Sequence, residues 1–312
     1  MHLLNTLYIC LVKENQFEVI IIGGSYAGLS AAMALGRSLR HVLVMDNNDP
    51  CNKQTPRSHN FITQDGEIPA NIIAKAKTQL ALYKTIQFHH GLAMGATKNK
   101  HGFTVTSQHG QHFHCKKILF ATGVKDETPP VPGFAECWGI SVLHCPYCHG
   151  YEVTNEPMAV LANGDIGYEF TKLISHWTAQ LTLLTNGPAA LTAEQQQRLH
   201  MHHISIIDKK IESIEHRNGY MTNLVFTDQT TIPLTAVFAR VPFRQHSDLP
   251  QTLGCIFTEA GHIQVDEFQK TSIAGLFAAG DNTTMFRSVA AAVAAGNKAG
   301  AIINHELINE EF

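Results

Sequence analysis

Residues 17–28 read FEVIIIGGSYAG. Their first half is a continuous apolar, β-branched run, which predicts a buried parallel strand that ends in a tight glycine turn. The next residues, LSAAMAL at 29–35, predict a helix, and residues 41–45 predict a second strand that ends at Asp46. A strand, glycine turn, helix and strand with an acid ~20 residues beyond the glycines form the pattern of a dinucleotide-binding unit.

The residues of this turn have separate physical tasks. Gly23 and Gly28 allow a sharp turn and close packing of the helix against the strand. The helix N-terminus offers N–H groups to a pyrophosphate, and Asp46 can accept hydrogen bonds from ribose hydroxyls. Ser25 replaces the middle glycine of the pattern, and it is small enough to keep the backbone near the phosphate. We therefore expect Gly23, Ser25, Gly28 and Asp46 to bind a dinucleotide.

A second, degraded copy of the pattern begins near residue 157. Residues 157–161 predict a strand, ANGDIG at 162–167 a turn, the following residues a helix through Trp177, and residues 181–184 another strand. Gly164 and Gly167 are the candidates for a weak second dinucleotide site.

Two substitutions weaken this second site. Ala162 stands where the first glycine is expected, and its Cβ disfavours a positive φ angle. Residues 185–187, TNG, offer neither an acid for a ribose hydroxyl nor an arginine for a 2′-phosphate. Two interpretations stay open: a nicotinamide site, or a Rossmann-like domain kept for its structure.

Two further strands end in residues suited to a cofactor. Residues 117–123 predict a strand that closes on a small-residue turn containing Thr122 and Gly123. Residues 275–281 predict a strand that ends at Gly280 and Asp281, followed by a helix of small residues at 289–296. An acid at this position can hold a polyol such as a ribityl chain.

The stretch HCPYCHG at 144–150 contains the closest pair of the seven cysteines, Cys145 and Cys148. Cysteines at this spacing can form a small disulfide, and one attacks as a thiolate when a cation or a helix N-terminus lowers its pKa. His149 can pass protons to and from the leaving thiol. A zinc half-site would need a second pair of ligands, and the sequence has no second CxxC. We expect Cys145, Cys148 and His149 to be catalytic, and no metal.

The composition excludes several classes of protein. The chain has 312 residues, of which 44% are hydrophobic and 16% charged, and its formal net charge is −3. These values are typical of globular domains, and no basic cluster indicates a nucleic acid partner. No apolar segment reaches the length of a membrane span, and residues 1–16 lack signal-peptide features, so we expect an N-terminal extension and no membrane partner. The odd cysteine count with one CxxC predicts a cytoplasmic protein.

These motifs together resemble the low-molecular-weight thioredoxin reductase family. GGSYAG, ATG at 121–123, CPYC, the degenerate glycine motif and AAGD at 278–281 occur in the order of that family. The resemblance implies an α/β fold of two Rossmann-like domains, the second inserted in the first. An FAD-binding domain would comprise 17–122 and 247–312, and an NAD(P)-binding-like domain with the dithiol would comprise 123–246. It also implies a homodimer.

The resemblance assigns roles to individual residues. It implies that Cys148 faces the flavin and that Cys145 exchanges with the substrate. Asn60, in HNF at 59–61, resembles the flavin-contacting asparagine of the family, and Asp281 resembles its ribityl ligand. Arg287 begins the last helix, where the family approaches the flavin ring. The complete set expected to bind FAD is Gly23, Ser25, Gly28, Asp46, Asn60, Thr122, Gly123, Gly280, Asp281 and Arg287.

The departures from the family leave the electron flow open. His149 stands where thioredoxin reductases usually carry an acid, and Asn186 with Gly187 where they carry phosphate-binding arginines. CPYCHGYE is closer to a branch that includes flavin dithiol oxidases. One hypothesis is an NAD(P)H-fed reductase of a thioredoxin-like protein or small disulfide. The second is an oxygen-coupled dithiol oxidase with little or no NAD(P)H use, and the third is a non-catalytic redox sensor.

Overall fold

The computed structural model describes residues 15–312. The N-terminal extension predicted at 1–16 therefore falls almost entirely outside the described residues. The chain forms two compact units. Unit 1 comprises residues 15–50, Ile72–Lys125 and Gln245–Phe312, and unit 2 comprises Cys51–Asn71 and Asp126–Arg244.

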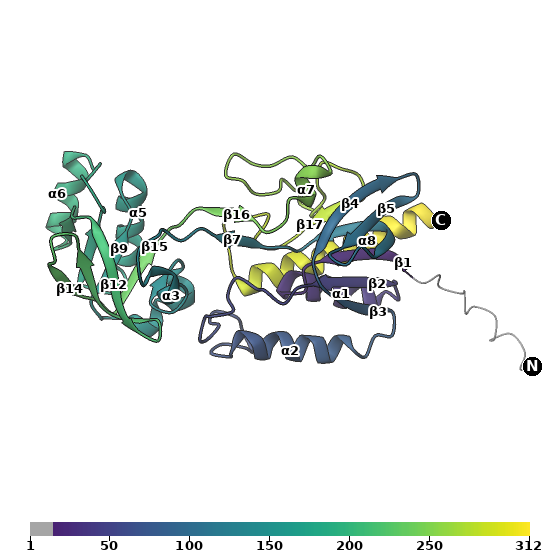
Figure 1. The fold of residues 1–312 in the computed structure, drawn as a ribbon, viewed down its shortest axis with the longest axis horizontal. Coiled ribbons are helices and arrows are strands. Elements are labelled where there is room, and N and C mark those ends of the chain that lie inside the picture. The colour runs from purple at the N-terminus through teal and green to yellow at the C-terminus, as the bar shows by residue number, and fades with distance from the viewer. Residues whose placement is uncertain (1–14) are drawn as a thin grey trace, which may run out of the picture. The chain divides into compact units, whose positions relative to one another are not determined.

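Unit 1 is built on a seven-stranded sheet in the order β3-β2-β1-β6-β5-β4, with β17 paired to β6 (Figure 1). The parallel strands are β1 (Gln16–Ile22), β2 (Val42–Asp46), β3 (Ile86–His90), β6 (His112–Phe120) and β17 (Leu276–Ala278). The strands β4 (Ala93–Asn99) and β5 (Gly102–Ser107) continue the sheet in antiparallel pairing. Unit 1 also contains α7 (Leu249–Thr252) and most of α2 (Pro69–Leu80).

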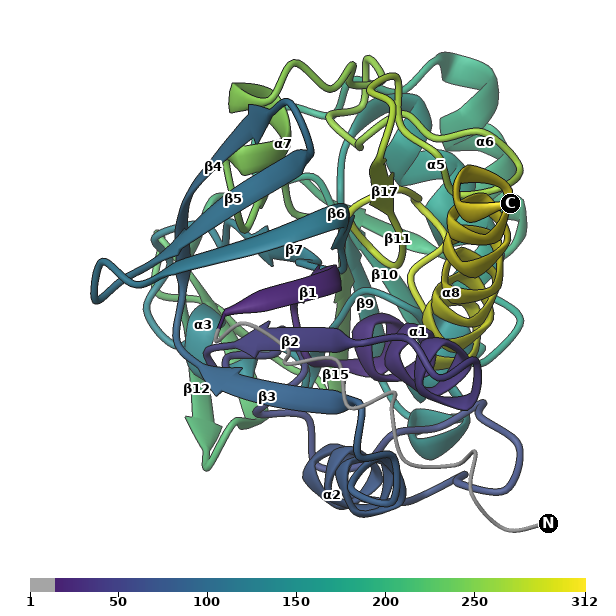
Figure 2. The same cartoon turned by 90° about the vertical axis from the view of Figure 1, so that its right-hand side faces the viewer.

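Both faces of the parallel strands are buried, as the apolar run at 17–22 predicts. Val19 and Ile21 of β1 belong to the core that contains α1 (Tyr26–Arg37) and α8 (Val289–Glu311). Ile20 and Ile22 belong to the core on the opposite face, with side chains of β4 and β5. Figure 2 shows α1 and α8 side by side against the sheet.

The helices α1 and α8 approach each other closely enough for their backbones to touch. A Cβ at Gly296 would collide with the carbonyl oxygen of Ala27, and one at Gly300 would lie 2.7 Å from the carbonyl oxygen of Ala31. The hydroxyl of Ser30 donates to the carbonyl oxygen of Val293 at 2.7 Å. The small residues of α8 therefore fix the position of α1, whose N-terminus begins directly after the glycine turn.

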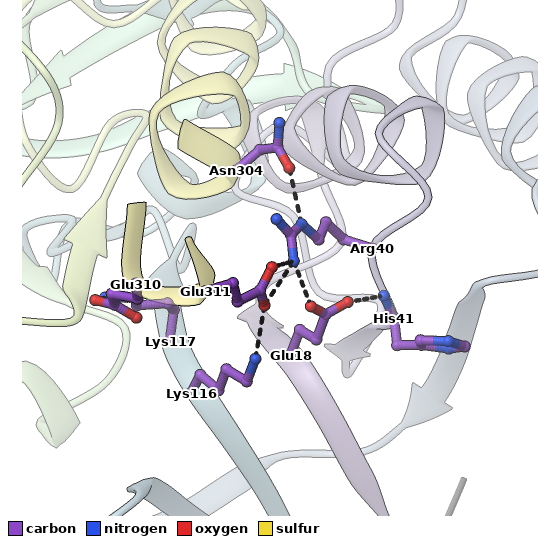
Figure 3. A network of polar contacts seen from close by, with 8 residues as sticks. All are labelled: Glu18, Arg40, His41, Lys116, Lys117, Asn304, Glu310 and Glu311. Atoms are coloured by element: carbon purple, nitrogen blue, oxygen red, sulfur yellow. Dashed lines mark hydrogen bonds and ion pairs between the residues drawn. The ribbon is translucent and has the colours of Figure 1, made fainter. Parts of the chain in front are cut away.

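A partly buried ion-pair network holds the far end of α8 to the sheet (Figure 3). The guanidinium of Arg40, whose side chain is 10% exposed, pairs with Glu18 at 2.6 Å and with Glu311 at 2.9 Å. It also donates to the side-chain oxygen of Asn304 at 2.8 Å. Lys116 of β6 pairs with the same Glu311 at 2.8 Å. Hydrogen bonds from Lys116 and Arg40 lower the pKa of Glu311.

Unit 2 contains a second parallel sheet, in the order β11-β10-β9-β15-β8. Its strands are β8 (Val142–Leu143), β9 (Met158–Leu161), β10 (Leu181–Leu184), β11 (Ser205–Ile207) and β15 (Ala236–Ala239). The helices α5 (Gly164–Ile174) and α6 (Ala193–Met201) share one core with this sheet. A second core joins it to α3 (Phe134–Cys137) and to the antiparallel strands β12 (Ile211–Arg217), β13 (Tyr220–Phe226) and β14 (Thr231–Pro233).

Four short elements complete the chain. The dithiol lies on α4 (Pro146–His149), which is followed by the 3-10 helix η1 (Tyr151–Val153). The strands β7 (Val124–Asp126) and β16 (Phe243–Gln245) pair with each other where the chain passes between the units. Among the helices of residues 15–312, none combines the length and apolar composition that crossing a bilayer requires.

The architecture confirms the α/β fold with two Rossmann-like parts, the second inserted in the first. The helix predicted through Trp177 is too long, because α5 ends at Ile174 and the chain leaves it through a turn at Ser175. Residues 51–71, which were expected in the FAD-binding domain, group with unit 2 by their contacts. The functional domain boundaries themselves stay a prediction.

Replacing Gly296 by alanine tests the helix contact. The added methyl group must displace the Ala27 carbonyl, so we expect the free energy of unfolding to fall by ~3 kcal/mol. The exposed neighbour Asn297 offers a matched control, since N297A should change stability by less than ~0.5 kcal/mol. Urea unfolding of both variants provides the comparison, and equal midpoints would contradict the close packing.

Replacing Arg40 by methionine tests the ion-pair network. The variant leaves Glu18 and Glu311 without their shared cation, and we expect a loss of ~2 kcal/mol because both acids are partly exposed. K172M removes the exposed pair between Lys172 and Glu169 on α5 and should cost less than ~0.5 kcal/mol. If the two variants unfold at the same urea concentration, the network contributes no more to stability than an exposed ion pair.

Candidate functional site

The glycine turn of unit 1 has the geometry that its sequence predicts. Gly23 has a φ of +109°, a conformation that L side chains rarely adopt, and a Cβ there would collide with the carbonyl oxygen of Ala121. A Cβ at Gly28 would collide with the carbonyl oxygen of Gly23. Ser25 is the N-cap residue of α1, and it makes no side-chain capping bond. The first turn of α1 also contains no acid, which suits an anion at this helix end.

Asp46 stands at the end of β2, beside this turn. Its carboxylate lies 3.7 Å from the ammonium of Lys77, and it would be only 2.9 Å from a Cβ at Gly24. The backbone of the turn is therefore bare on the side that faces the acid. A cavity of about 300 Å³ opens here, lined by the ends of β1 and β2, residues 91–94, Thr122 and residues 246–249.

Asp281 follows β17 on the same edge of the sheet. Its carboxylate lies 3.4 Å from Nε of Arg287, so these two predicted site residues are brought together. Gly280 has a φ of +98° and closely approaches Ala27 of α1. Ser288, next to Arg287, caps α8 by accepting a hydrogen bond from the N–H of Ala291.

Asn282 is a buried polar residue that the sequence analysis missed. Its amide nitrogen donates to the carbonyl oxygen of Phe120 at 2.9 Å and lies 3.4 Å from the hydroxyl of Thr122. Its side-chain oxygen is buried and has no hydrogen-bond partner among residues 15–312. The sequence analysis also missed His262, which is buried near Arg287. Burial and the charge of Arg287 lower the pKa of His262. Gly123 follows Thr122 with a φ of +62° and open space around it.

The dithiol is organised by the four-residue helix α4. Cys145 is its N-cap residue, Pro146 occupies the first helical position, and the carbonyl oxygen of Cys145 accepts from the N–H groups of Cys148 and His149. This turn places the two sulfur atoms 2.6 Å apart, and both cysteines are half-buried. Gly150 follows the helix, and the position requires a glycine because a Cβ there would lie 2.5 Å from the carbonyl oxygen of Pro146.

His149 lies against a histidine that the sequence analysis did not assign a role. Its ring meets that of His59 edge to face, with 6.2 Å between the centroids. The ring nitrogens of His59 lie 3.6 Å from a carboxylate oxygen of Asp65 and 3.4 Å from one of Glu152. Burial, with a smaller contribution from His59, lowers the pKa of His149 to about 4. His149 is therefore an uncharged proton acceptor at neutral pH.

Asn60 is exposed, with a φ of +57°, and its backbone N–H donates to Asp65 at 2.7 Å. It belongs to unit 2, together with the dithiol, whereas the other residues expected to bind FAD belong to unit 1. Its predicted contact with the flavin stays a prediction.

The turn of unit 2 differs from that of unit 1. Its positive φ, +60°, is at Gly164, whereas Ala162 does not have a positive φ. Gly167 performs the packing role of the third glycine, because a Cβ there would lie 3.0 Å from the carbonyl of Ala162. The alanine is thus tolerated because the backbone takes its left-handed residue two positions later.

The side chain of Asn163 closes this second turn. Its oxygen accepts from the N–H groups of Gly164 and Ala190, each at 2.8 Å, and its nitrogen donates to the carbonyl oxygen of Pro188 at 2.9 Å. The loop after β10 is thereby tied to the N-terminus of α5. This is the crevice in which dinucleotides bind to Rossmann folds.

Two further side chains occupy positions that a dinucleotide would use. Asp165 places a carboxylate in the first turn of α5, where it accepts from the amide of Gln195 at 2.7 Å. A negative charge there opposes a pyrophosphate. Asn186, at the expected ribose position, accepts from the N–H of Ile211 at 2.8 Å. The predicted site at Gly164 and Gly167 is therefore crossed by the protein's own hydrogen bonds.

Comparison with known proteins fixes the family. The model of the family described as pyridine nucleotide-disulphide oxidoreductase matches residues 17–296. The chain belongs to this family. A relative named thioredoxin reductase tcpT, from Claviceps purpurea, is 31% identical over 306 residues, which cover 95% of each protein.

Two solved structures with similar sequences have the same fold. An oxidoreductase from Agrobacterium tumefaciens is 34% identical with a TM-score of 0.88, covering 94% of this chain and 99% of that one. A putative thioredoxin reductase, TrxB from Bacillus anthracis, is 29% identical with a TM-score of 0.91, covering 95% of this chain and all of that one.

Pyridine nucleotide-disulphide oxidoreductases of the thioredoxin reductase type imply FAD, and unit 1 fits this cofactor. The evidence in the structure is the side-chain-free turn at Gly23, the cavity beside Asp46 and the buried, unpartnered oxygen of Asn282. Within residues 15–312, no group of three or more His, Cys, Asp or Glu side chains could hold a metal ion.

The low pKa of His149 predicts a pH-dependent stability. His149 takes up a proton near pH 6.5 in the unfolded chain but only near pH 4 in the folded chain. The free energy of unfolding is therefore highest above pH 6.5 and falls as the pH is lowered toward 4, because the unfolded state binds the extra proton. The His149→Gln variant lacks this loss. We expect the difference in free energy of unfolding between variant and wild type to change by ~2 kcal/mol over this range, measured by urea unfolding. Parallel pH curves would contradict the burial of a neutral His149.

Proposed function

We propose that this chain is an FAD-dependent thiol–disulfide oxidoreductase whose redox pair is Cys145 and Cys148. The observation that carries the proposal is the pair of sulfur atoms 2.6 Å apart on α4, beside an uncharged His149. The thioredoxin reductase names of the relatives support it. Its substrates would be the dithiol or disulfide of a thioredoxin-like protein or a small molecule.

Thiol–disulfide exchange follows from this arrangement. In the oxidising direction, a substrate thiolate attacks Sγ of Cys145, the Cys145–Cys148 bond breaks, and Cys148 leaves as a thiolate. The second substrate thiol then displaces Cys145, which yields the substrate disulfide and the reduced cysteine pair. His149 accepts the proton that the attacking thiol releases. In the reducing direction, the same steps run in reverse.

FAD, when bound in unit 1, supplies a two-electron partner for the cysteine pair. The residues that would hold it are those of the glycine turn for the pyrophosphate, Asp46 for a ribose, and Asp281 with Arg287 for the ribityl side. The packing of α1 in the core of unit 1 holds the glycine turn in place.

The contacts of Asn163, Asp165 and Asn186 favour the oxygen-coupled version of this activity. They occupy the crevice that a nicotinamide dinucleotide would need, so electrons would enter through the dithiol. A substrate dithiol then loses two electrons and two protons, and oxygen receives them as hydrogen peroxide. The names of the relatives favour the NAD(P)H-fed version. The homodimer remains a proposal carried by the family resemblance, and the cytoplasmic location remains a proposal carried by the cysteine pattern.

Anaerobic reduction by dithiothreitol tests the redox pair. We expect the reagent to bleach the visible absorbance of the bound flavin in the wild type, and expect the rate to fall at least ~100-fold in C145S and C148S. The exposed Cys51 gives the control, because C51S should bleach like the wild type. Equal rates in all four proteins would contradict a catalytic cysteine pair, and absence of turnover with any dithiol or disulfide would favour the sensor.

The direction of electron flow has its own experiment. In air, we expect dithiothreitol oxidation to produce one hydrogen peroxide per dithiol. Under anaerobic conditions, NADH and NADPH should leave the flavin oxidised, because the unit 2 crevice is closed. Rapid bleaching by either nucleotide would contradict the oxidase and establish the reductase.

A further inference from the structure

One segment between β2 and α2 contacts both ends of the dithiol motif. We call this segment, residues 51–68, the strap. By its contacts the strap belongs to unit 2, although both of its ends continue into unit 1, at Pro50 and at Ile72. It is therefore a piece of unit 2 that the chain supplies from outside the sheet and helices of that unit.

Gln54 fastens the first half of the strap ahead of the dithiol. Its amide nitrogen donates to the carbonyl oxygen of Ala135 in α3 at 3.0 Å and also to that of Trp138. The indole ring of Trp138 lies beside the imidazole ring of His144, with 6.1 Å between the centroids. His144 directly precedes Cys145 in the chain. The strap is thus attached two side chains away from the first cysteine.

A hairpin fastens the second half of the strap beyond the dithiol. The backbone of residues 58–67 closes this hairpin with two N–H···O=C hydrogen bonds of 2.8 Å. The ring of His59 meets that of His149 edge to face, with 6.2 Å between the centroids. A ring nitrogen of His59 also lies 3.4 Å from a carboxylate oxygen of Glu152. Because His149 directly follows Cys148, the strap flanks the dithiol on both sides.

The closed position of the strap carries three local costs. Thr63 has a φ of +72°, which is a conformational outlier for a β-branched residue, and Asn60 has a φ of +57°. The hydroxyl of Ser58 is buried and has no hydrogen-bond partner among residues 15–312, which is also unfavourable. All three costs are relieved when the strap relaxes into water. The contacts of Gln54 and His59 therefore hold a segment that is ready to open locally.

We propose that the strap is a size-selective gate beside the dithiol: small thiols and disulfides reach Cys145 while the strap is closed, whereas a folded protein reaches it only after the strap releases at Gln54. The half-buried state of Cys145 and Cys148 supports the proposal, because it leaves an opening for a small reagent and none for a protein surface. The inference rests on the proposed function, whose two substrate classes it separates by the step that each requires.

Alkylation of the FAD-loaded protein measures this access without turnover. The C148S background is used, so that Cys145 cannot reoxidise with its partner. The two reagents are N-ethylmaleimide and ubiquitin that carries a maleimide on its surface, and mass spectrometry of the peptides reports the rate at Cys145. The same rates in urea-unfolded protein correct for the intrinsic reactivity of each reagent.

Release of the strap at Gln54 should raise access selectively. Gln54→Ala removes the hydrogen bonds to Ala135 and Trp138. We expect the ubiquitin reagent to react about tenfold faster in this variant, and the rate of N-ethylmaleimide to change by less than about twofold. Ile62→Ala, at an exposed position of the same strap, is the matched control and should change neither rate.

Thr63→Asn tests the gate in the opposite direction, because asparagine adopts a positive φ more readily than threonine. We expect the ubiquitin reagent to react about threefold more slowly in this variant. An equal effect of Gln54→Ala on both reagents, or no effect, would overturn the gate, and so would an unchanged or faster rate in Thr63→Asn. Failure of the wild type to bleach with dithiothreitol would overturn the proposed function instead, while the alkylation rates would still report on the strap.

Discussion

The close approach of backbone to backbone at glycine is the constraint on which unit 1 depends. At Gly28 and Gly296 the position of a Cβ coincides with a carbonyl oxygen of another segment. These two contacts press the first turn of α1 against the end of β1 and against α8. The ion pairs of Arg40 then hold the far end of α8 to the strands. A bare turn at a helix N-terminus, suited to an anion, is the result.

Unit 2 repeats the same chain path with a different outcome. Its turn also packs closely through Gly167, but Asn163 fills the crevice with its own hydrogen bonds and Asp165 adds a negative charge. These contacts are the reason for our proposal that unit 2 does not bind a nicotinamide dinucleotide. In this chain the second unit is better equipped to present the dithiol on α4, with His149 and His59 beside it.

The parts of this account that the sequence predicted are those with local causes. The buried strand at β1, the turn at Gly23 and the acid at Asp46 follow from side-chain size and spacing within one βαβ unit, and so does the CxxC helix. The contact of His59 with His149 joins positions far apart in the chain, and no spacing rule indicates it. The bridge made by Asn163 depends on how the loop after β10 folds back against α5. The positive φ angle lies at Gly164 and not at Ala162, and this also depends on the path of the backbone there.

We propose that electrons reach this protein through its cysteines and that the crevice of unit 2 does not bind nucleotides. Isothermal titration of the FAD-loaded protein with NADPH and with NADH tests it most directly. The account predicts no saturable binding to the wild type. Replacing Asn163 by glycine removes the bridge and should increase the affinity for nucleotide. Saturable binding of either nucleotide to the wild type, weakened by substitutions at Gly167, would contradict the account.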